Sequence, residues 1–180
     1  MGDLYRELEL IEKIKGLKEA GVDLDKNDNE KQQTALHILV KKDNLVGIRV
    51  MLREGANPEK QDIYGCTPLC IAAIDGNLNA VKILIDHGAN PNIICKRLVR
   101  DENCEKKSDT LEGLETKEEY IEDNLFCHVI SLAKQKDNSP IVRSRYLSIA
   151  KIMVFNGLDL KDLKNKEAAK GYKSIQGLFV

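Results

Sequence analysis

The chain has few aromatic residues and no long apolar run, and each shortage excludes a class of protein. Only 4% of its 180 residues are aromatic and none is Trp, so it lacks the stacking side chains that typically hold single-stranded nucleic acid. No apolar run reaches the roughly 18 residues needed to span a bilayer. Residues 1–7 also lack the basic-then-apolar order of a signal peptide. We therefore expect neither a nucleic acid nor a membrane partner.

An excess of charge of one sign is also missing. The 28 basic and 29 acidic residues leave a formal net charge of −1, so no overall field draws the protein to polyanions or anionic lipid. The 5 cysteines cannot all pair within one chain, and their spacing is not that of a small disulfide framework. We expect free thiols in a reducing compartment, with the cytoplasm as the default location.

What the chain does contain is an internal repeat. Gly-Ala-Asn at residues 55–57 returns at 88–90, and Thr-Pro-Leu at 67–69 corresponds to Thr-Ala-Leu at 34–36, each after 33 residues. A period of about 33 residues that opens with a Thr-Pro-Leu-His type motif and closes with Gly-Ala-Asn resembles the ankyrin repeat, in which a turn and two helices form one unit.

The residue types of the motif suit the local backbone that a turn and two helices require. Thr67 is a good helix cap and Pro68 suits the first helical turn, because its missing N–H leaves no bond unmade there. Gly88 can end a helix in the left-handed conformation. The first repeat carries Gln32 and Asp43 where the second has glycine, so we expect its turns to be looser.

The resemblance implies an all-α ankyrin-repeat solenoid of about three repeats plus helical caps, forming one domain with a long insertion between the second and third repeats. Residues 117–122 could begin the first helix of the third repeat, and its second helix is expected to start near Pro140 and run long. The expected units are an N-terminal helical cap or half repeat (1–26), repeat 1 (27–60), repeat 2 (61–93), a charged insertion loop (94–122), a divergent repeat 3 (123–160) and a C-terminal capping helix (161–180).

The sequence gives little support for a metal site or a catalytic site. Cys66 and Cys70 lie across a turn and a helix start, where we expect their side chains to diverge, and the adjacent Cys127 and His128 should point apart, which disfavours a zinc site. The resemblance makes His37 a structural residue, and no phosphate loop or catalytic triad is evident. We expect no enzyme, cofactor, metal or small-molecule substrate. The alternative is an ankyrin domain that carries or regulates a Cys- or His-based catalytic or metal site.

The resemblance implies a binding surface made of the turns between repeats and the exposed side of each first helix, which together form a concave strip. The partner would be another protein, and the role that of a signalling inhibitor or a host-directed effector. Apolar side chains on this strip are typical of contact sites. The alternative is that the insertion or the next turn covers them. The expected partner-binding residues are Lys31, Gln33, Lys41, Lys42, Ile63, Tyr64, Cys66, Ile74 and Asp75.

Overall fold

A computed structural model describes residues 2–27, 29–99, 119–135 and 138–158. No helix within these residues is long and apolar enough to cross a membrane. In chain order the helices and strands are α1 (Gly2–Glu19), α2 (Ala35–Lys41), α3 (Leu45–Arg53), α4 (Pro68–Ile74), α5 (Leu78–Asp86), β1 (Ile94–Val99), β2 (Glu119–Asn124), α6 (Leu125–Lys134) and α7 (Pro140–Phe155).

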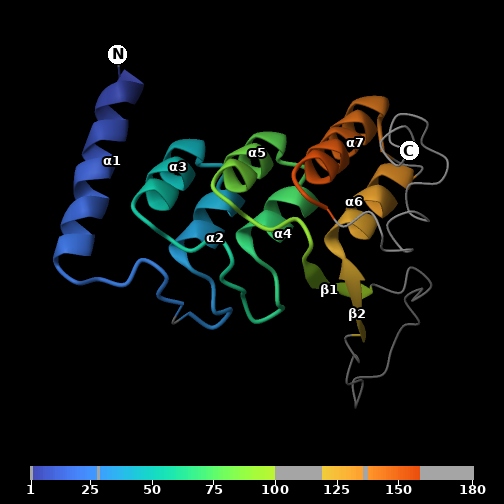
Figure 1. The fold of residues 1–180 in the computed structure, drawn as a ribbon, viewed down its shortest axis with the longest axis horizontal. Coiled ribbons are helices and arrows are strands. Elements are labelled where there is room, and N and C mark those ends of the chain that lie inside the picture. The colour runs from blue at the N-terminus through green and yellow to red at the C-terminus, as the bar shows by residue number, and fades with distance from the viewer. Residues whose placement is uncertain (1, 28, 100–118, 136–137, 159–180) are drawn as a thin grey trace, which may run out of the picture.

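The helices from α2 onward form three pairs that stack side by side in two layers (Figure 1). In the inner layer α2 packs against α4 and α4 against α6; in the outer layer α3 packs against α5 and α5 against α7. α1 packs against α3 and so takes the place of an outer helix. This arrangement confirms the ankyrin solenoid.

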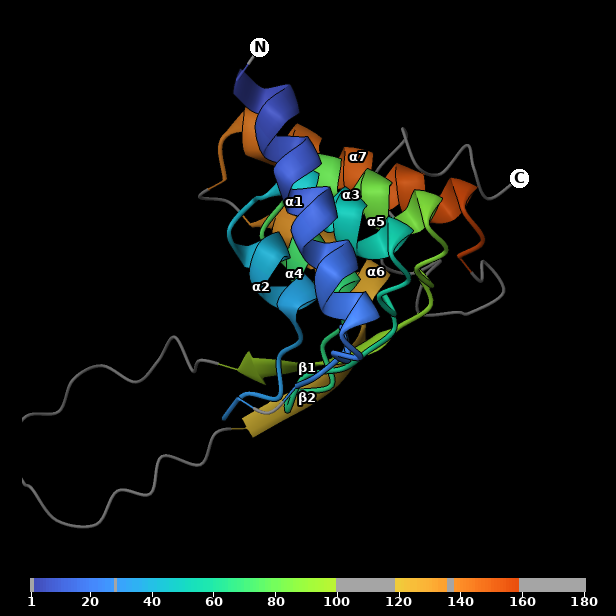
Figure 2. The same cartoon turned by 90° about the vertical axis from the view of Figure 1, so that its left-hand side faces the viewer.

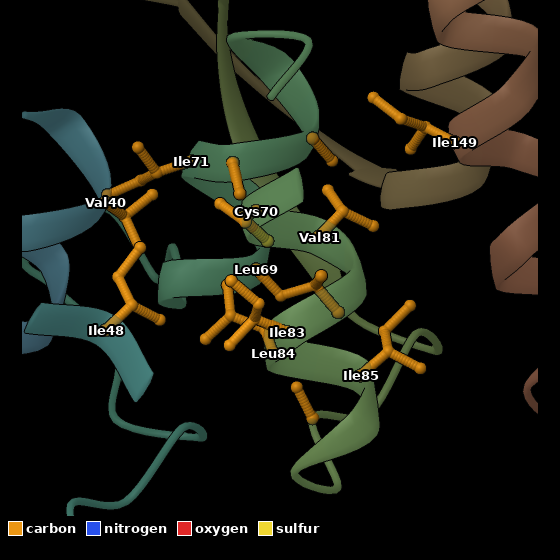
Figure 3. Close-up of a cluster of buried hydrophobic side chains, with 14 of the residues drawn as sticks. Val40, Ile48, Leu69, Cys70, Ile71, Val81, Ile83, Leu84, Ile85 and Ile149 are labelled. Carbon is orange, nitrogen blue, oxygen red and sulfur yellow. The ribbon is translucent and has the colours of Figure 1, made fainter. Parts of the chain in front are cut away.

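The core is continuous along the stack. Figure 3 shows the side chains of α4 and α5 converging between the helices, with Val40 and Ile48 on one side and Ile149 on the other. The apolar faces of α4 and α5 are therefore covered by the pairs on either side. Ala72 and Ala73 are fully buried in α4, where small side chains let adjacent helices approach closely.

The helix starts follow from local sequence. The side chain of Thr67 accepts a hydrogen bond from the Cys70 N–H at 3.3 Å, and that of Asn77 accepts one from the Ala80 N–H at 3.1 Å. The expectation of looser turns in the first repeat is wrong. Gln32 and Asp43 take φ of 51° and 52°, in the same left-handed region as their glycine equivalents in the second repeat, so the turn geometry is kept despite the conformational cost to a residue with a Cβ.

Two strands interrupt the helical pattern. β1 and β2 pair antiparallel from Ile94 opposite Asn124 to Val99 opposite Glu119, and they extend to the side on which α2 lies (Figure 2). The suggestion that residues 117–122 begin a helix is therefore wrong from Glu119 onward. Both runs contain β-branched or aromatic residues, which favour a strand once a partner is available.

The remaining expectations fall partly outside the described residues. α7 begins at Pro140 and extends over 16 residues, against 9 in α5, so the expected long second helix of the third repeat is confirmed. Residues 100–118 of the expected insertion and the expected capping helix at 161–180 lie outside the described residues. The boundaries of the units stay predictions.

Candidate functional site: the inner face

The turn between α3 and α4 is held by the buried carboxylate of Asp62. Its Oδ1 accepts hydrogen bonds from the backbone N–H groups of Tyr64 and Cys66, both at 3.0 Å. These bonds fix the tip of the turn, because a short acceptor side chain holds the backbone that follows it. Ile63 and Tyr64 consequently remain 52% and 38% exposed.

Neighbouring turns are joined by hydrogen bonds. The Ile63 N–H donates to the Lys31 carbonyl at 3.0 Å, and Gln33 Nε2 donates to Asp62 Oδ2 at 3.2 Å. Gln33 is buried, so its expected place on the exposed binding strip is wrong. A buried carboxylate needs donors for both oxygens, and Gln33 supplies the second one from the preceding repeat.

His37, in the first turn of α2, links the same two repeats. It is fully buried, and its Nδ1 accepts a hydrogen bond from the Thr34 N–H at 3.1 Å and lies 2.8 Å from Thr34 Oγ1. Its Nε2 lies 3.0 Å from the Cys66 carbonyl. This pattern assigns the proton of a neutral imidazole to Nε2, which donates to that carbonyl.

His37 should make stability depend on pH. Burial lowers its pKa below the ordinary value of 6.5, so below pH 6.5 the unfolded chain binds more protons than the folded one. Its contribution to stability is therefore complete above pH 6.5 and declines as pH falls toward the lowered pKa. Urea unfolding of wild type and of His37→Gln between about pH 5 and pH 8 should show a stability difference that shrinks toward low pH. A difference independent of pH would contradict this assignment.

The inner helices contribute apolar and charged groups beside the turns. Ile38 on α2 is 39% exposed, whereas Ile74 on α4 is half-buried and packs against the core. Lys41, Lys42 and Asp75 are exposed at the ends of these helices. Burial raises the pKa of the Asp75 carboxyl above its ordinary value, and the positive charge of Lys41 acts in the opposite direction. Sequence reasoning missed Ile38, although it directly follows the motif histidine.

Beyond these helix ends lies a recess of about 490 Å³. Its far wall comes from α7: the Tyr146 hydroxyl donates to the Ile74 carbonyl at 3.0 Å, which places Arg145 at the rim. Sequence reasoning missed this recess, whose only sequence signal is the extra length of α7. Its lining consists of Val40, Lys41, Asp43, Asp75, Gly76, Asn77, Leu78, Asn79 and Arg145.

Comparison with known proteins agrees with this geometry. A family model described as ankyrin repeats in three copies matches residues 5–109, more than half of the chain. The protein belongs to the ankyrin repeat family. A solved ankyrin repeat domain from Acinetobacter baumannii has a TM-score of 0.61 and 21% identity, covering 94% of this chain and 74% of that one. At that identity the match shows the ankyrin fold alone.

Three curated proteins are similar to this chain over short stretches. The putative ankyrin repeat protein FPV222 of fowlpox virus is 38% identical over 52 residues, which cover 29% of this chain and 7% of that protein. The human SH3 and multiple ankyrin repeat domains protein 2 is 41% identical over 66 residues, 37% of this chain and 4% of that protein. The glycerophosphocholine phosphodiesterase GDE1 of Eremothecium gossypii is 36% identical over 70 residues, 38% of this chain and 5% of that protein, within the repeat region. This chain thus spans less than a tenth of each relative.

The thiols of the second ankyrin motif lie close together. Cys70 occupies the position of the motif histidine, and its thiol hydrogen-bonds with that of Cys66, contrary to the expected divergence. The side chain of Cys70 points back toward the helix start, as helical side chains do. This bond and then burial raise the pKa of the Cys66 thiol far above its ordinary value, which disfavours the nucleophilic thiolate. In the described part of the chain, no three His, Cys, Asp or Glu side chains are grouped so as to hold a metal ion.

Proposed function

We propose that this protein is a non-enzymatic binding module whose inner face captures another protein. Ankyrin repeats generally mediate protein-protein interaction. The observation that supports the proposal here is the exposure of Ile63 and Tyr64 on a turn fixed by Asp62. Rigid exposed apolar and aromatic groups favour binding because little conformational freedom is lost when a partner covers them.

The proposed contact residues differ in two places from those expected from sequence. Gln33 is left out because it is buried, and Ile38 is added because it is exposed on α2. Cys66 and Ile74 are half-buried and would line the floor of the contact. The proposed set is Lys31, Ile38, Lys41, Lys42, Ile63, Tyr64, Cys66, Ile74 and Asp75.

Ile63→Asp and Tyr64→Ala should each weaken partner binding by about 10-fold or more, because each removes an anchor at the centre of the contact. The protein would be used to capture its partner from cell extract, and dissociation constants would then be measured with the purified partner. Ile141→Asp is the matched control for Ile63→Asp: Ile141 is 74% exposed, but it lies on the outer helix α7. Thermal unfolding of the variants should stay within a few degrees of wild type.

Equal loss of binding in Ile63→Asp and Ile141→Asp would count against the inner face, as would unchanged binding in both Ile63→Asp and Tyr64→Ala. The role as a signalling inhibitor or a host-directed effector, and a location in the cytoplasm, are further parts of this proposal. The identity of the captured protein tests the proposed role, and its cellular compartment tests the proposed location.

A further inference from the structure

The inner helices are basic, although the chain as a whole is nearly neutral. With the residues that cap their C-terminal ends, α2, α4 and α6 carry the lysines 41, 42 and 134 and a single acid, Asp75. The whole chain has a formal net charge of −1. The inner helices therefore carry an excess of positive charge, which attracts anionic groups during approach. Glu30 beside Lys31 and Asp43 beside Lys42, both in the adjoining turns, reduce this excess.

Three of the lysines on this face are available to a partner. Lys31, Lys41 and Lys42 are exposed, and among the described residues none of their ammonium groups forms a salt bridge or hydrogen bond. A lysine elsewhere shows the contrast: Lys18 on α1 donates to the Glu54 carbonyl at 2.6 Å and lies 3.9 Å from its carboxylate. The inner-face ammonium groups can pair with carboxylates without first breaking a bond within the protein.

Asp75 is the acid on these helices that opposes this field. Its carboxylate is not among the salt bridges or hydrogen bonds of the described residues, and partial burial makes its charged form less favourable. An approaching anion would meet the charges of Lys41 and Lys42 near two acids, Asp75 and Asp43. The carboxylate of Asp43 already accepts a hydrogen bond from Asn77 Nδ2 at 2.6 Å.

The apolar part of the face lies beside the lysines. Ile63 is bonded through its backbone to Lys31 on the preceding turn, and Ile38 lies one helical turn before Lys41 and Lys42 on α2. We infer that the inner face binds a partner segment that carries carboxylates together with an apolar side chain, the carboxylates pairing with Lys31, Lys41 and Lys42 and the apolar group contacting Ile38 and Ile63. This inference rests on the proposed function.

A library of random 12-residue peptides displayed on phage tests the inference directly. Peptides selected on wild type should be more acidic than the starting library and should contain an apolar residue. Synthetic copies should bind Lys41→Glu/Lys42→Glu about 10-fold more weakly or worse, because two attractions become repulsions. Binding to wild type should also weaken with added salt. Lys82→Glu, on the exposed side of α5, is the matched charge reversal on an outer helix and should bind them like wild type.

Three results would overturn the inference: selected peptides no more acidic than the library, equal binding to Lys41→Glu/Lys42→Glu and wild type, or no selection above the bare support. If the double variant fails to fold, peptide binding is measured with Lys31→Glu instead. A captured partner that depends on Tyr64 but is insensitive to Lys41→Glu/Lys42→Glu would leave the proposed function intact and reject only the acidic segment. Loss of acidic-peptide binding in Ile63→Asp, with wild-type stability, would support both.

Discussion

Replacing Phe126 by alanine is expected to lower the free energy of unfolding by about 3–5 kcal/mol. Phe126 is the largest fully buried side chain among the described residues, and it belongs to α6, which packs against both α4 and α7. The truncation removes apolar contacts and leaves a cavity that close-packed neighbours fill only in part. Urea unfolding followed by circular dichroism measures the loss.

Phe155→Ala provides the matched control. Phe155 is 74% exposed on α7, so the same chemical change should alter the unfolding free energy by less than about 0.5 kcal/mol. Repeats stabilise mainly their neighbours, so hydrogen exchange in the Phe126→Ala protein should quicken most in α6 and α7 and least in α1. Similar losses for the two phenylalanines would show that the packing around α6 is incorrectly described.

The second large effect is expected from His37→Ala, at about 2–4 kcal/mol. The substitution removes the acceptor for the Thr34 N–H and the donor to the Cys66 carbonyl. His37 is fully buried, so loss of its ring also leaves a void. The Thr34 N–H and the Cys66 carbonyl would then lack a partner at a site that water reaches poorly. The loss should appear as a lower urea midpoint with little change in slope.

Two variants separate this role from a general effect of removing histidine. His87 is exposed at the end of α5, and His87→Ala should change stability by less than about 0.5 kcal/mol. His37→Gln should retain part of the stability, because an amide at the third helical position can bond back to the capping residue. A His37→Ala protein as stable as wild type would show that the link between the two repeats contributes little.

The features that were predictable from sequence are local ones. The helix starts at Thr67 and Asn77 depend on residues within three positions of the cap, and the repeat spacing is visible in the chain itself. The role of His37 was implied by family resemblance, and its bond to Cys66 across 29 residues supports it. The cap at Asn77 recurs in the first repeat at Asn44, whose side chain accepts from the Gly47 N–H at 2.9 Å, so a short motif is enough to predict it. The contact of His37 does not recur in this form in the second repeat, where Cys70 takes the corresponding position.

The features that sequence reasoning missed depend on distant segments. In the paired strands Leu98 lies opposite Tyr120, a pairing that no short window reveals, since each run alone fits more than one structure. Gln33 looks like a surface residue until the carboxylate of Asp62 from the next repeat is placed beside it. The recess at Arg145 likewise requires the position of α7 over the end of α4.

The single-file stacking of the helix pairs has a mechanical consequence. In the described part of the chain the main contacts of each pair are with the pairs on either side of it, so a slight rotation at one interface disturbs the others little, and small rotations add along the array. We therefore expect the stack to bend elastically, so that the distance between the Ile63 turn and the rim at Arg145 changes while neighbouring pairs stay packed.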